Sequence, residues 1–139
     1  MRLKKRFVVA AALVGAIAAF SAVAFAGSPH FVTADATRSG NTLTVTFKEA
    51  GLGNEPQVHV VLSATALCIN NGGHHPKAVN KASVSAAGDF PVQNGKAEGT
   101  LSVTATFQPD CTPPMTVVFT DVTLTDVTSG ATANIPGTF

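Results

Sequence analysis

Cys68 and Cys111 are the residues whose types most clearly allow chemistry, since they are the only cysteines in the chain. They have no CxxC spacing, so ligation of a metal by the two sulfurs has little support. In an oxidising compartment two such thiols form one intramolecular disulfide. Closing a loop of about 44 residues restricts the unfolded chain by about 4 kcal/mol in the chain-entropy treatment. We therefore expect a Cys68–Cys111 disulfide.

A second group of polar side chains lies in the segment 70–76, which reads Asn-Asn-Gly-Gly-His-His-Pro. Its candidate binding residues are Asn70, Asn71, His74 and His75. Two imidazoles could hold a transition metal, with an amide or a carboxylate completing the shell. Adjacent residues in an extended loop rarely point at one ion, however, and no HxH or HxxxH spacing occurs. The favoured interpretation is a pair of solvated loop histidines and no metal site.

The loop after the second cysteine supplies the other candidate binding residues, Thr112, Pro113, Pro114 and Met115. A disulfide-tethered, proline-stiffened loop that ends in an apolar side chain suits a rigid loop presented to a protease. This loop faintly resembles the reactive loop of the secreted subtilisin inhibitors of streptomycetes. Those proteins carry two disulfides and a Cys-Pro-Met order that this chain lacks. A strand-connecting loop is favoured, and protease inhibition through Cys111–Met115 is an alternative.

The acidic residues give no catalytic pattern. Asp110, Asp121 and Asp126 lack the alternating spacing of a calcium loop, so we interpret them as turn and surface residues. There is no GxSxG motif, and eight scattered acids do not define a glycosidase pair. The absence of Trp and Tyr, which stack on sugar rings, disfavours carbohydrate binding. We expect no catalytic residues, no cofactor and no enzyme activity.

The N-terminus has the pattern of a secretory signal peptide. Basic residues at positions 2–6 precede an uncharged run from Phe7 to Ala26, which ends in Ala-Phe-Ala. Cleavage before Gly27 is expected, and residues 27–139 then form one domain. The run is long enough to cross a bilayer but consists mostly of Ala and Val, and no basic cluster follows it. A retained membrane anchor is therefore disfavoured, and the mature protein is expected outside the cell and free of the membrane.

Removal of the leader reverses the sign of the net charge. Four of the nine basic residues lie in residues 1–26, and all eight acids lie after them, so the charge changes from +1 to −3. An acidic chain has no electrostatic attraction to nucleic acid. The expected partner is therefore an extracellular ligand or protein of unknown identity.

The elements that would position these loops are β-strands, because apolar residues recur at every second position. Leu43, Val45 and Phe47 define one strand after the Ser39–Asn41 turn, and Phe31–Thr37 precedes that turn. Residues 57–69 form a longer strand with Cys68 on its apolar face, and residues 101–107 repeat the pattern shortly before Cys111. The disulfide would then tie two strands across the core, as in immunoglobulin-like sandwiches.

The segment Met115–Val127 changes the parity of its apolar residues, since Val117 and Phe119 take one face and Val122 and Leu124 the other. A bulge or a change of sheet is therefore expected near Thr120–Asp121. Asn94–Gly95 is the strongest two-residue hairpin signal. Residues 79–87 supply a weaker strand, and residues 131–139 supply a final strand or an extended tail. The prediction is an all-β, immunoglobulin-like antiparallel β-sandwich of seven or eight strands.

Four segments of the chain have distinctive motifs, which read Phe-Lys-Glu-Ala-Gly-Leu-Gly at 47–53, Cys-Ile-Asn-Asn-Gly-Gly at 68–73, Pro-Lys-Ala-Val-Asn-Lys at 76–81 and Ile-Pro-Gly-Thr-Phe at 135–139. Together these motifs resemble those of a group of small secreted actinobacterial proteins that carry no established function. The resemblance implies a bacterial exported protein and no activity. The secreted antitumour chromoproteins are similar in size, export route and fold class, although they have two disulfides. The expected function is a non-catalytic extracellular binding or structural module, and the alternatives are a protease inhibitor or a carrier of a small apolar ligand.

Overall fold

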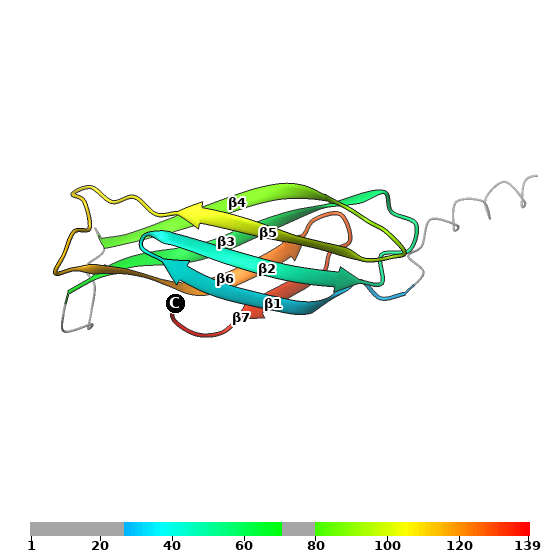
Figure 1. Ribbon diagram of the computed structural model, residues 1–139, viewed down its shortest axis with the longest axis horizontal. Coiled ribbons are helices and arrows are strands. Elements are labelled where there is room, and N and C mark those ends of the chain that lie inside the picture. The colour runs from blue at the N-terminus through cyan, green and yellow to red at the C-terminus, as the bar shows by residue number, and fades with distance from the viewer. Residues whose placement is uncertain (1–26, 71–79) are drawn as a thin grey trace, which may run out of the picture.

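A computed structural model describes residues 27–70 and 80–139, in which seven strands form two antiparallel sheets (Figure 1). The strands are β1 His30–Ser39, β2 Thr42–Ala50, β3 Gln57–Ile69, β4 Lys81–Pro91, β5 Ala97–Thr104, β6 Thr116–Asp126 and β7 Thr132–Ile135. One sheet has the order β1-β2-β5 and the other β4-β3-β6-β7. The predicted all-β antiparallel sandwich of seven or eight strands is confirmed.

The core lies between the two sheets and follows from the alternation of apolar residues. On β2, Leu43, Val45 and Phe47 are fully buried, while the threonines between them lie on the outer face. The observed bounds of β3 are those predicted, and all six residues of the apolar parity are buried. These residues are Val58, Val60, Leu62, Ala64, Ala66 and Cys68. The period of two therefore determines which side of each strand enters the core.

The expected bulge on β6 is present. Opposite the single residue Ala64 of β3, β6 has the two residues Asp121 and Val122. Asp121 has a φ of 53°, in the left-handed region that few residues other than glycine adopt. The extra residue changes the facing of the strand, so Val117 and Phe119 before it and Val122 and Leu124 after it are all buried.

The Asn94–Gly95 turn forms, but it does not join two neighbouring strands of one sheet. Asn94 and Gly95 have φ values of 55° and 75°, as a two-residue turn of this type requires, and Gln93 pairs with Lys96 across them. β4, however, belongs to the four-stranded sheet and β5 to the three-stranded one. The hairpin signal depends on residues 94 and 95 alone. It therefore cannot indicate that the strands before and after the turn belong to different sheets.

A glycine makes room for an aromatic ring beside this crossing. A Cβ on Gly99 of β5 would overlap the ring of Phe90 on β4. The Phe90 ring also packs edge-to-face on Phe47, with ring centroids 5.0 Å apart. Phe90 thus bridges the two sheets where β4 and β5 lie close together, and only glycine fits opposite it.

The last residues of the chain belong to the four-stranded sheet. After β7 pairs with the second half of β6, Phe139 exchanges two main-chain hydrogen bonds with Phe119, at 2.9 and 3.0 Å. Residues 131–139 were expected to form a strand or an extended tail, and they form both a short strand and this returning pair. Within residues 27–70 and 80–139, no helix is long and apolar enough to cross a membrane.

Candidate functional site

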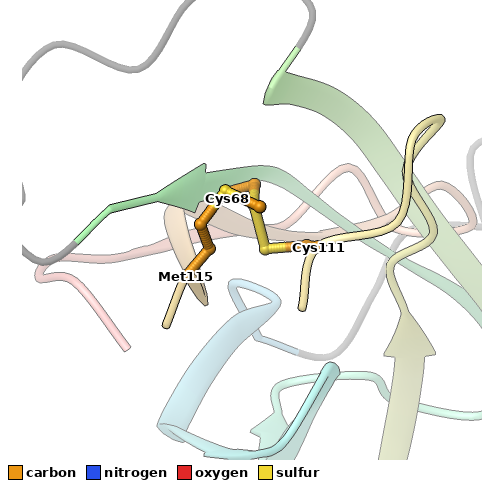
Figure 2. Close-up of a disulfide and its surroundings, with 3 residues drawn as sticks. All are labelled: Cys68, Cys111 and Met115. Carbon is orange, nitrogen blue, oxygen red and sulfur yellow. A yellow bond between two sulfur atoms is a disulfide. The ribbon is translucent and has the colours of Figure 1, made fainter. Parts of the chain in front are cut away.

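The Cys68–Cys111 disulfide is present, with the two Cα atoms 5.8 Å apart (Figure 2). Cys68 is the penultimate residue of β3 and is 3% exposed, whereas Cys111 is half-buried. Cys111 is not on a strand, because β5 ends at Thr104. The expectation that the disulfide ties two strands across the core is therefore wrong. It joins the end of one strand to the β5–β6 connection, at one end of the sandwich.

The residues after Cys111 form a closed turn. The amide of Met115 donates to the carbonyl of Thr112 at 2.9 Å, and Pro113 and Pro114 occupy the two positions between them. Thr112, Pro113 and Pro114 are exposed. Met115 is partly buried and lies against the disulfide, with its sulfur 3.7 Å from that of Cys68 (Figure 2). The turn thus exposes three residues to solvent, and the disulfide and the Met115 side chain pack beneath them.

The other candidate loop leaves from the same end. Asn70 directly follows β3 and is exposed, two residues after Cys68. Asn71, His74 and His75 lie outside the described residues. The disulfide therefore brings the start of one candidate loop and the whole Thr112–Met115 turn to the same end of the domain.

The opposite end of the sandwich contains two buried acids. Glu49, near the end of β2, is 1% exposed, and Asp126, at the end of β6, is 0% exposed. The hydroxyl oxygen of Ser129 lies 3.2 Å from Glu49 Oε1 and 2.5 Å from Asp126 Oδ2. The interpretation of Asp126 as a surface residue is wrong, whereas Asp110 and Asp121 are exposed. We call Glu49, Asp126 and Ser129 the carboxyl cluster.

Burial determines the protonation of the carboxyl cluster. Removal of Glu49 from water raises its pKa from 4.5 to about 8, and the hydrogen bond with Asp126 and the negative charge of Asp126 act in the same direction. The hydrogen bond from Ser129 acts in the opposite direction and is weaker. At neutral pH Glu49 is therefore a neutral acid.

A sequence signal for these acids existed. Glu49 continues the inward parity of Leu43, Val45 and Phe47, and Asp126 continues that of Val122 and Leu124. Extending each pattern by two residues would have placed both acids inside. The pattern alone could not show that they meet, because they lie on different sheets.

A depression of about 540 Å³ lies near this end, and the buried Glu49 and Ala97 are among its lining residues. Its walls come from the first half of β1, the end of β2, and the turn before β5, including Val32, Ala50, Pro91 and Lys96. Val32 is 56% exposed because of the irregularity in β1 pairing between Phe31 and Thr33. The interior between the sheets is occupied by packed side chains such as Phe47, Phe119 and Leu62, which are fully buried.

Among residues 27–70 and 80–139, no group of three or more His, Cys, Asp or Glu side chains is arranged to hold a metal ion. No protein-family model matches the chain, and comparison with curated proteins and with solved structures finds no match.

Proposed function

We propose that the chain is an exported, non-catalytic binding module with an immunoglobulin-like fold, and that it binds an extracellular macromolecule through the disulfide end. The observation that carries the proposal is the exposed Thr112–Pro114 turn above a fixed base. A turn held by a disulfide and a packed Met115 loses little conformational freedom on binding, which lowers the entropic cost of association.

The strand order supports an immunoglobulin-like classification. Constant immunoglobulin domains place the fourth strand beside the fifth, and the third, sixth and seventh strands form the other sheet. Here the orders β1-β2-β5 and β4-β3-β6-β7 differ from that arrangement only in the fourth strand, which lies beside the third. The disulfide is a second departure, because those domains join the second and sixth strands.

Export is supported by the leader pattern of residues 1–26, by the resemblance to small secreted actinobacterial proteins and by the disulfide, which suits an oxidising compartment. The test is the mass of the protein in the medium of the producing cells. A mature chain that begins at Gly27 supports export, and a chain that stays in the cytoplasm with residues 1–26 attached contradicts it.

The two alternative functions receive less support. An inhibitory loop needs an apolar side chain that projects into a protease, and Met115 instead lies against the disulfide. Titration of subtilisin-like proteases tests this alternative, and no inhibition at micromolar concentration excludes it. A carrier needs an apolar space, and the interior is filled by residues such as Phe47 and Phe119. Native mass spectrometry of the secreted protein would reveal a bound ligand as an added mass.

Binding at the disulfide end can be tested by site-specific crosslinking. A photoreactive amino acid replaces Thr112 in one variant and Ser102, an exposed residue on the outer face of β5, in a matched control. In the culture of the producing cells, we expect a discrete crosslinked product from position 112 and none from position 102. Absence of a product from both positions, or equal products from both, contradicts a binding site at the disulfide end.

The non-catalytic part of the proposal has a separate test. The mature protein is incubated with a panel of ester, peptide and glycoside substrates. Turnover that is lost when a single polar residue is replaced would overturn it.

A further inference from the structure

We propose that Glu49 and Asp126 share one proton and thereby form a pH-dependent latch, which holds the β6–β7 turn of one sheet against β2 of the other. The latch lies at the end of the domain opposite to the disulfide, because antiparallel β3 and β6 pair Ile69 with Thr116 at one end and Val60 with Asp126 at the other.

The first support is an imbalance of hydrogen-bond donors. Ser129 has one hydroxyl proton, so it can donate to Glu49 or to Asp126 but not to both at once. Glu49 Oε2 is buried and has no donor from any other group of the described residues. Two buried carboxylates with one hydroxyl between them would repel each other without compensation. One added proton on Glu49 removes a charge and supplies the missing donor.

The second support is the difference between the two carboxyl groups. Asp126 accepts from the amide of Thr128 at 2.8 Å through Oδ1, in addition to the hydroxyl of Ser129 through Oδ2. These two donors stabilise a negative charge on Asp126. Apart from its hydrogen bond with Asp126, Glu49 has only the longer contact to the hydroxyl of Ser129. The proton therefore resides on Glu49, which donates it to Asp126.

The third support is that, among the described residues, no Lys, Arg or His forms an ion pair with Glu49 or Asp126. The strand neighbours of Glu49 are Phe31 on β1 and Ala97 on β5, and that of Asp126 on β3 is Val60. Lys48 and Glu98 form an exposed pair beside each other, with 64% and 72% of their side chains accessible. His59 and Asp89 form a second exposed pair on the other sheet, and Lys96 lies in the turn before β5. None of these groups donates to Glu49 Oε2.

The latch affects the conformation of the β6–β7 turn, because Asp126 and Ser129 form the hydrogen bonds that hold this turn together. Gly130 donates to the carbonyl of Asp126 at 2.7 Å, and the amide of Asp126 donates to Ala131 at 2.8 Å. Ser129 Oγ accepts from the amide of Ala131 at 3.2 Å while it contacts Glu49. Ionisation of Glu49 would place a second negative charge against this turn and weaken its attachment to β2.

The sign of the pH effect follows from proton linkage. In the unfolded chain Glu49 loses its proton near its ordinary pKa of 4.5, and in the folded protein it retains the proton up to about pH 8. Unfolding between these values releases one proton, so the unfolding equilibrium constant should rise about tenfold per pH unit, up to the folded pKa. This contribution to stability is fully present below pH 4.5 and is lost as the pH passes 8.

The test compares the pH dependence of urea unfolding in the wild type and in Glu49→Gln, whose amide can still donate to Asp126 but does not titrate. We expect the free energy of unfolding of the wild type to fall relative to that of the variant between pH 5 and pH 8. The wild-type unfolding constant should rise by about tenfold per pH unit over this range. The matched control is Glu98→Gln, an exposed acid on the next strand, whose profile should follow the wild type. Parallel wild-type and Glu49→Gln profiles overturn the latch.

A second measurement keeps the proposal testable if Glu49→Gln fails to fold. The chain has three glutamates, Glu49, Glu55 and Glu98. Labelling of glutamate side-chain carboxyls with carbon-13 allows each to be titrated by NMR in the wild-type protein. We expect the Glu49 carboxyl to titrate near pH 8. Titration of the Glu49 carboxyl near its ordinary pKa of 4.5 would refute the shared proton.

Discussion

Removal of the disulfide in a Cys68→Ala, Cys111→Ala variant should destabilise the protein by a few kcal/mol. The two cysteines are 43 positions apart, so the closed loop restricts the unfolded chain by about 4 kcal/mol in the chain-entropy treatment. Measured losses for small domains of this kind are about 2–5 kcal/mol. The melting temperature should fall by about 10–20 °C, from the usual relation between free energy and melting temperature for a domain of this size.

Urea unfolding at constant pH measures the loss, with the oxidised wild type as reference and Thr112→Ala as a control for a surface change near the bridge. The denaturant dependence should also become steeper, because an unfolded chain without the crosslink exposes more surface. Two free thiols in the purified wild type, or equal melting temperatures for the wild type and the double variant, would contradict this reasoning.

Three further changes test the packing. Gly99→Ala should destabilise the domain by about 1–3 kcal/mol, because the new methyl overlaps the Phe90 ring, while Ser102→Ala on the same strand should change little in urea unfolding. Asp121→Gly should be neutral or stabilise the protein by about 0.5–1 kcal/mol, because glycine accepts the φ of 53°. Asp121→Val should destabilise the protein. Thermal melts that give Asp121→Val the higher stability would contradict the bulge. Phe119→Ala should cost about 3–5 kcal/mol, because Phe119 is fully buried, and a loss below 1 kcal/mol in chemical denaturation would show that the site is not packed.

The sequence was most informative where the residues of a single strand determine which of its side chains are buried. The parity of residues 57–69 predicts the bounds and the buried face of β3, and the change of parity on β6 predicts the bulge at Asp121. The pairing of Cys68 with Cys111 needed only an oxidising compartment and the absence of other cysteines.

The sequence was least informative where two sheets meet. The Asn94–Gly95 signal is correct as a turn, but its local chemistry does not encode that β4 and β5 belong to different sheets. The contact between Glu49 and Asp126 depends on sheet packing in the same way, since each acid occupies an inward position of its own strand. Of the candidate site, the Thr112–Pro114 turn could be predicted as an exposed loop, and the inward position of Met115 follows from the parity that it shares with the buried Val117 and Phe119.

The pairing of Phe119 with Phe139 has a consequence for when the protein can fold. β6 receives its outer partners only from residues 132–139, so its edge stays open while those residues are still inside the ribosome. Until then the growing chain can form the β1–β2 and β3–β4 pairs, but the four-stranded sheet lacks its last strand. An open edge invites pairing with other chains. A nascent chain in this state is therefore exposed to pairing with other chains until residues 132–139 have emerged and the edge of β6 is covered.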